Sequence, residues 1–172
     1  MGNLAPMNGL LKVLNLSFIP SSADLGLLFL RAALGGGMLA LHGWKKLELL
    51  LGWGEWARPK AGTTMEALTR LRYSEIGKFP DPLKISGTYS LVLTTFAEAV
   101  CSALLIIGFC TRFAATGLLF GMGVAFFIVH EGALSGKGSG ELAAVYLIGF
   151  FALFIAGPGR YSFDGSGGAD AE

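Results

Sequence analysis

The sequence predicts an all-α fold, an integral membrane bundle of four antiparallel helices, for three reasons. Four apolar stretches approach the length of about 20 residues that a helix needs to cross a bilayer; they cover residues 25–41, 90–109, 113–129 and 142–157. Only 15% of the residues are charged, whereas soluble domains average about 25%. The second and third links are short, so neighbouring helices must run antiparallel. We expect residues 1–172 to form one domain.

Residues 1–23 precede the first apolar stretch and show no pattern of small residues typical of signal cleavage. We expect this segment to be an amphipathic lead-in at the membrane surface. Pro20 ends it. Ser21, Ser22 or Asp24 can then cap the first membrane helix, since short polar side chains accept hydrogen bonds from free backbone N–H groups.

Residues 42–86 form the only sizeable segment that we expect outside the membrane, and their tryptophans suit the membrane interface. Residues 65–76 predict a short polar helix, and the two prolines of the FPDPL motif predict a rigid turn because proline fixes φ. The link 130–140 is rich in glycine, and the tail 165–172 has few apolar residues to bury. We therefore expect a mobile link and a disordered tail.

The charge distribution predicts how the bundle is oriented. With four spans, both termini lie on one side, called side A, and the first and third links lie on side B. Side B carries eight Lys or Arg residues in 42–86 plus Lys137, whereas side A carries Lys12, Arg112 and Arg160. Because positive residues favour the cytoplasm, we expect both termini outside and the first and third links in the cytoplasm.

Two charged residues, Arg31 and Glu98, lie inside the apolar stretches. An isolated charge at that depth is costly, and mutual pairing or protonation of the carboxyl group would relieve the cost. The functional interpretation is a quinone-contacting or proton-accepting site, and the structural one is a buried pair that fixes helix register. Helical spacing also predicts a polar stripe facing the other helices; it consists of Thr94, Glu98, Cys101, Ser102 and Leu105.

Three more ionisable residues lie at the side B ends of the stretches. His42 ends the first, His130 ends the third and Glu141 begins the fourth, so antiparallel packing brings them to one membrane face. Histidine exchanges protons near neutral pH and also ligates metals. The three residues do not form a compact ligand motif, and we predict no metal site. Proton or quinone chemistry and plain structural hydrogen bonds at the helix ends both stay open.

Side A offers a structural clamp rather than a reactive site. Arg112 lies in the short link after the second stretch, and Gly157 with Pro158 ends the fourth. Asp24 and Asp164 are the acidic residues with which Arg112 can pair at the interface.

Four blocks in order resemble the DoxX family of small four-helix membrane proteins: LFLRAALGGGMLALHGWKKLE, EAVCSALLIIGFCTR, HEGALSGKGSGELAAVYL and GPGRYSFD. The similarity extends over residues 25–164. It implies a bacterial-type inner-membrane protein linked to redox processes, in a wider family that includes the membrane subunit of a thiosulfate:quinone oxidoreductase. The residues that match the blocks are Arg31, His42, Glu98, Arg112, His130, Glu141, Arg160 and Asp164.

Three functional hypotheses follow. The chain is a quinone-contacting membrane subunit of a redox complex, a structural or assembly subunit that binds a partner through the first loop, or a small transporter or channel. It has no flavin, nucleotide or haem motif, so a bound quinone is its one candidate electron carrier.

Expected partners are lipid and a protein partner or second copy. We expect no nucleic acid, for which the net charge of +1 gives no argument. Candidate catalytic residues are Glu98, His42, His130 and Glu141, and candidate quinone-binding residues are Arg31, Glu98, His42 and His130.

Overall fold

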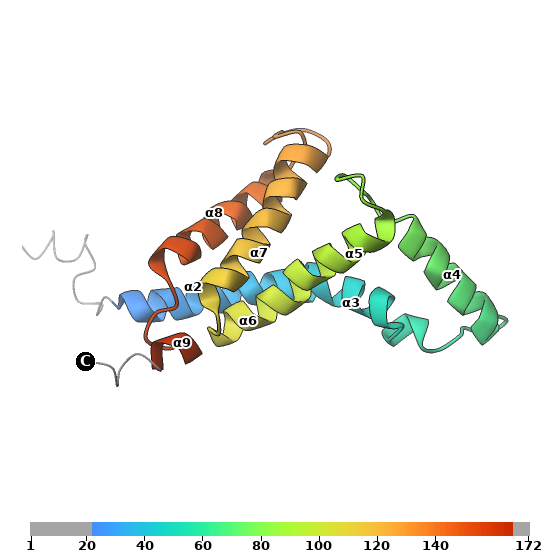
Figure 1. The fold of residues 1–172 in the computed structure, drawn as a ribbon, viewed down its shortest axis with the longest axis horizontal. Helices are drawn as coiled ribbons and strands as arrows, with labels where there is room; N and C mark the ends of the chain where they lie inside the picture. The colour runs from blue at the N-terminus through green and yellow to red at the C-terminus, as the bar shows by residue number, and fades with distance from the viewer. Residues whose placement is uncertain (1–21, 167–172) are drawn as a thin grey trace, which may run out of the picture.

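The computed structural model describes residues 22–166, which form helices joined by turns and contain no strand. Figure 1 shows the spans running antiparallel, which confirms the predicted all-α membrane bundle. The elements in chain order are α2 (Ala23–Met38), η1 (Leu39–Gly43), α3 (Trp44–Leu51), η2 (Gly54–Trp56), α4 (Met65–Gly77), α5 (Gly87–Thr95), η3 (Phe96–Cys101), α6 (Ser102–Ile107), α7 (Thr111–Gly123), η4 (Val124–Val129), α8 (Glu141–Ala156) and α9 (Phe163–Ser166).

The first span is one long helix made of α2, η1 and α3. Ser22 caps its start as one of the three predicted caps, with its Oγ accepting a hydrogen bond from the Leu25 N–H at 3.3 Å. The helix then continues through α3, so residues 42–51, which we expected in the extramembrane loop, are helical. These residues lack proline, and Gly52 finally ends the helix in the left-handed conformation with φ of 72°.

The second span combines α5, η3 and α6, the third combines α7 and η4, and the fourth is α8 alone. Within the described range, three helices are long and apolar enough to cross a membrane. Helix α8 is apolar but has only 16 residues, about 24 Å at 1.5 Å per residue. This is less than the roughly 30 Å of hydrocarbon in a bilayer, so the residues that flank α8 must reach the interface.

Three spans each contain one π-helical turn, in which backbone hydrogen bonds skip one residue more than in an α-helix. These turns are η1, η3 and η4. Turns η1 and η4 lie towards side B in their spans, and η3 lies near the middle of the second span. Isolated π turns are rare and occur often at functional sites. The residues of these three turns are therefore candidates for a functional site.

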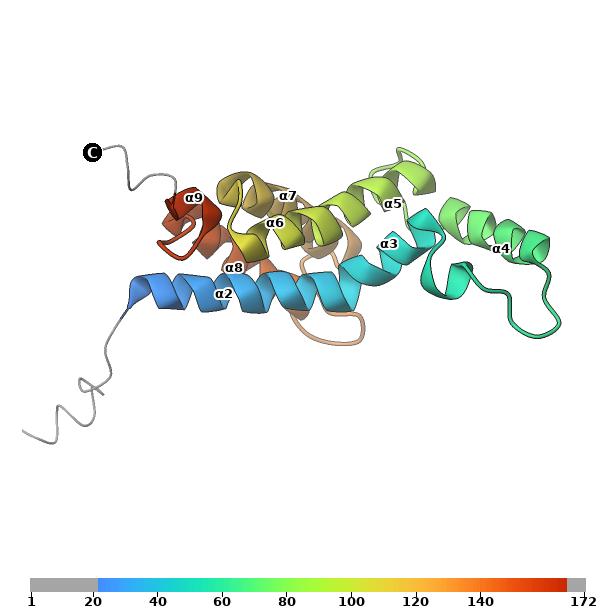
Figure 2. The same cartoon turned by 90° about the horizontal axis from the view of Figure 1, so that it is seen from below.

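The core lies where α7 packs on α8 and α2 packs on α6, as Figure 2 shows from below. Phe150 and Leu153 of α8 are fully buried there. Close approach of α2 and α6 depends on Gly35, where a Cβ would lie 3.1 Å from the Ser102 carbonyl oxygen. Gly36 faces open space instead.

The extramembrane part contains the predicted polar helix. Helix α4 covers Met65–Gly77 and is capped by the hydroxyl of Thr64. Figure 1 shows it projecting beyond the bundle next to α3 and α5. At the carboxyl end, α9 makes residues 165 and 166 helical rather than disordered. The rest of the tail, and the lead-in up to residue 21, lie outside the described residues.

The proline turn before α5 is organised by Asp81. Its carboxylate accepts hydrogen bonds from the N–H groups of Ile85 at 3.0 Å and Ser86 at 2.6 Å, and from the Ser90 hydroxyl at 2.7 Å. Desolvation alone would raise the pKa of Asp81, but these bonds favour the carboxylate and together hold the pKa below its ordinary value. Asp81 therefore fixes the start of the second span.

Candidate functional site

Arg31 is fully buried and serves as a cap for α6. Its Nη1 donates to the carbonyl oxygens of Leu105 at 3.3 Å and Ile106 at 3.4 Å, and its Nη2 donates to the Tyr161 carbonyl at 2.5 Å. The last carbonyls of a helix lack partners and carry partial negative charge, which a guanidinium neutralises. Arg31 thus joins α2, the end of α6 and the segment after α8.

Asp164 completes this clamp on side A by capping α7. Its carboxylate accepts from the N–H groups of Cys110 at 2.9 Å and Thr111 at 2.8 Å, and from the Thr111 hydroxyl at 2.9 Å. Desolvation would raise the pKa of Asp164, but these bonds and the charge of Arg31 together lower it below its ordinary value. The structural clamp on side A is confirmed, but Asp164 and Asp24 accept hydrogen bonds from backbone N–H groups instead of pairing with Arg112. Asp24 accepts its bond from the Arg160 N–H at 2.9 Å.

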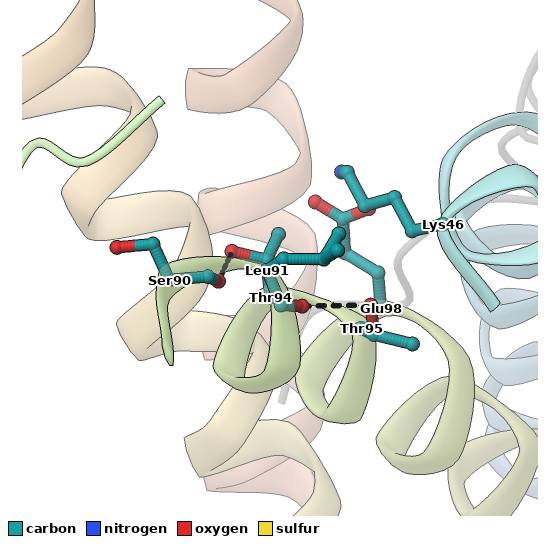
Figure 3. A network of polar contacts seen from close by, with 6 residues as sticks. All are labelled: Lys46, Ser90, Leu91, Thr94, Thr95 and Glu98. Carbon is teal, nitrogen blue, oxygen red and sulfur yellow. Dashed lines mark hydrogen bonds and ion pairs between the residues drawn. The ribbon is translucent and has the colours of Figure 1, made fainter. Parts of the chain in front are cut away.

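Glu98 points into the bundle and is 5% exposed, as its depth in the second span predicts. Its partner is Lys46 of α3, whose Nζ forms an ion pair with Oε2 (Figure 3). Mutual pairing of Glu98 with Arg31, one of the alternatives that the sequence left open, is therefore wrong. Glu98 lies at the level of Gly43, where an added Cβ would lie 2.9 Å from the Ala99 nitrogen. Arg31 is twelve residues away from Gly43 along the same helix, about 18 Å.

A cavity of about 310 Å³ opens beside Glu98. All three π turns contribute to its wall: η1 through His42, η3 through Glu98 and η4 through Ala125. The complete lining is Met38, His42, Glu98, Met122, Ala125, His130, Ser139, Leu142, Ala143 and Tyr146. The structure therefore brings His42, His130 and Glu98 to one cavity. It does not bring Glu141 there, because that side chain is exposed at the start of α8, and it places Arg31 outside the lining.

The two histidines are held in different ways. The Nδ1 of His130 lies 2.7 Å from the Gly138 carbonyl oxygen, which can only accept a hydrogen bond. Nδ1 therefore carries a proton, and Nε2 remains for other contacts. The His42 ring meets the Tyr146 ring edge to face, with centroids 6.2 Å apart and an interplanar angle of 86°. Tyr146 in turn stacks on Phe150 at 5.6 Å, which fixes this wall of the cavity.

Lys46 and Tyr146 are among the residues of this site that sequence reasoning missed. Lys46 was placed in a loop because the apolar stretch stops before it. The signal that could have found it is helical spacing, since Lys46 is four residues after His42 and falls on the same helix face. Tyr146 carries a hydroxyl in an otherwise apolar span, a pattern that indicates an inward-facing side chain.

The arrangement suits a small, flat and partly polar ligand. Imidazole and carboxylate groups can form hydrogen bonds with polar atoms of a ring, and the methionine and alanine side chains give apolar contact. Within residues 22–166, no three His, Cys, Asp or Glu residues are close enough to hold a metal ion.

Comparison with known proteins supplies a family. No curated protein and no solved structure matches the chain. The sequence model of the DoxX family matches residues 26–131, more than half of the chain. The match includes the first three spans and therefore His42, Glu98 and His130 of the cavity. The chain, a multi-pass membrane protein by its apolar helices, belongs to the DoxX family.

Proposed function

We propose that this protein is the membrane subunit of a redox-linked complex and that its cavity receives the head group of a quinone. The observation that carries the proposal is the cavity itself, where three π turns meet around two histidines and a buried ion pair. Its volume of about 310 Å³ is at the lower end of the roughly 300–1,000 Å³ typical of small-ligand pockets. A single ring system fits such a volume better than a larger cofactor.

The lining supplies both kinds of contact that a quinone head group requires. Met38, Met122 and Leu142 provide apolar surface against the faces of a ring. His42 and His130 provide ring nitrogen atoms for hydrogen bonds with the polar groups of the ring, which are carbonyls in the oxidised form and hydroxyls in the reduced form. Most of the lining residues belong to the membrane-spanning helices, and a quinone with a long apolar tail is dissolved in the lipid around those helices.

Electron transfer requires a second protein in this proposal. The chain has no flavin, nucleotide or haem motif, and its two cysteines are free, with Cys101 buried and Cys110 exposed. A partner that carries a redox centre must therefore exchange electrons with the bound quinone. The role of this chain is to bind the head group, orient it and exclude lipid from it.

The test is quinone retention by the purified protein. Native mass spectrometry from a gentle detergent should detect one quinone, in its oxidised or reduced form, for each chain after extraction from bacterial membranes. His42→Ala and His130→Ala should each reduce its retention by about tenfold, because each removes one hydrogen-bonding group worth about 1–2 kcal/mol. Glu141→Gln is the matched control, since this side chain lies outside the lining. Retention that survives both histidine substitutions would contradict the proposal.

One observation favours the structural alternative, in which the chain binds a partner through its first loop. Helix α4 projects beyond the bundle, and its Leu71 and Tyr73 are 55% and 61% exposed. Leu71→Asp should then abolish co-purification of a partner and leave quinone retention intact. Loss of quinone in this variant would link the loop to the cavity instead.

A further inference from the structure

The hydrogen-bonding groups that line the cavity bear on which oxidation state of a quinone it binds. This inference rests on the proposed function and adds the oxidation state that the site prefers. His130 is the first group to consider, because the Gly138 carbonyl fixes its proton on Nδ1. A neutral imidazole with that tautomer has an unprotonated Nε2, which is a hydrogen-bond acceptor.

Glu98 is the second group. The ammonium of Lys46 holds Oε2 in an ion pair, and an ionised carboxylate has acceptor atoms only. Among the described contacts, none occupies Oε1, while Glu98 itself lines the cavity. The Lys46 ammonium, the strongest donor nearby, is engaged with Oε2 and does not line the cavity.

Tyr146 also lines the cavity and carries a donor, but its hydroxyl points elsewhere. A Cβ added to Gly37 of α2 would lie 2.7 Å from this hydroxyl oxygen, which places the oxygen against the α2 backbone. The ring of Tyr146 faces His42, so this residue contributes surface rather than a proton. His42 and Ser139 also line the cavity, and each offers a donor as well as an acceptor. With Glu98 and His130 added, the polar lining therefore has more acceptors than donors.

A quinone presents carbonyl oxygens, which only accept hydrogen bonds, whereas a hydroquinone presents two hydroxyl groups that donate. Two acceptors that face each other leave both unsatisfied after water is removed, which is unfavourable. We infer that the cavity binds hydroquinone in preference to quinone, with Glu98 and His130 as the groups that accept its hydroxyl protons in hydrogen bonds. Figure 3 shows the Glu98 carboxylate beside the Lys46 ammonium.

Equilibrium binding of one probe in two oxidation states tests the inference. The probe is a short-tailed benzoquinone, titrated anaerobically into the purified full chain before and after chemical reduction. We expect the hydroquinone to bind about tenfold more tightly than the quinone. For a two-electron couple, a tenfold preference raises the midpoint potential of the bound form by about 30 mV, which redox titration measures independently.

Two substitutions assign the preference to residues. Glu98→Gln replaces an acceptor by an amide that can also donate, so the two oxidation states should bind within about twofold of each other. His130→Gln makes the same change at the second acceptor and keeps the test valid if Glu98→Gln does not fold. Glu131→Gln, an exposed carboxylate next to His130 that does not line the cavity, should retain the tenfold preference.

The outcomes separate this inference from the proposed function. Equal or tighter binding of the quinone to the wild-type protein would overturn the inference and leave quinone binding standing. Binding of neither form would overturn both. A preference that persists in both Glu98→Gln and His130→Gln would overturn the assignment to these two residues.

Discussion

At the scale of single residues, the ion pair with Lys46 holds the Glu98 carboxylate that lines the cavity. Removing one partner of a buried pair leaves an uncompensated charge, which is more costly than never having had the pair. Glu98 is nearly buried, and the Lys46 side chain is only 23% exposed, so water cannot replace the missing partner well.

The first prediction concerns Lys46→Met. We expect it to lower the free energy of unfolding by about 3 kcal/mol, the lower end of the range for broken buried pairs, because Lys46 keeps some contact with solvent. The double variant Lys46→Met with Glu98→Gln should recover at least half of this loss. Reversible unfolding in mixed micelles measures both. If the double variant is as unstable as the single one, packing rather than charge explains the effect.

The second prediction concerns pH and Asp164. Its folded-state pKa is lowered below the ordinary value of 3.8, so its stabilising effect is fully present above that value and is lost as pH falls through the lower folded pKa. Asp164→Asn should therefore lower the melting temperature at pH 7, and the difference from wild type should shrink below about pH 4. Asp81 titrates in the same range in both proteins, so its effect cancels in the comparison. A difference that does not change with pH would contradict this account.

At the scale of elements, the π turns η1 and η3 approach each other through Gly43. A side chain there would overlap the backbone of the second span, since even its Cβ would lie 2.9 Å from the Ala99 nitrogen. Backbone cannot move aside as a flexible side chain can. Gly43 therefore sets the distance between the two walls that carry His42 and Glu98.

The third prediction follows from this contact. Gly43→Ala should separate the first and second spans, destabilise the protein by about 1–3 kcal/mol as overpacking does, and weaken quinone retention. Gly36→Ala on the same helix is the matched control, because a Cβ there meets no atom within 4 Å. Unfolding measurements and native mass spectrometry of both variants provide the comparison. Equal behaviour of the two alanine variants would show that the close approach at Gly43 is not required.

Local signals predicted most of these elements, but not the contacts between them. The helix start at Ser22 and the polar helix α4 follow from capping and composition, which are properties of neighbouring residues. The π turns were not predicted because one skipped hydrogen bond leaves the apolar pattern unchanged. The partners of Arg31 and Glu98 depend on how far each span is shifted along its neighbour, which hydropathy does not contain.

At the scale of the whole molecule, the first and the fourth membrane helices differ in length. The helix from α2 to α3 covers residues 23–51, about 43 Å at 1.5 Å per residue, whereas α8 has 16 residues and spans about 24 Å. The first helix therefore extends beyond α8 on side B. The cavity lies between the first two spans and the side B end of the α7–α8 pair, where His130 is located.

Most of the positive charge lies on side B. The last prediction therefore concerns the orientation of the bundle in the membrane. A reporter that is active only in the cytoplasm should work when inserted between α3 and α4, and a reporter that is active only outside should work after residue 172, because Lys and Arg residues retain short loops inside. Replacing Arg58, Lys60, Lys78 and Lys84 with glutamine should weaken the bias and give mixed orientation. Termini on opposite sides would contradict the four-span bundle. Termini in the cytoplasm would keep the bundle but place side B, with the part of the cavity that His130 lines, on the outer face.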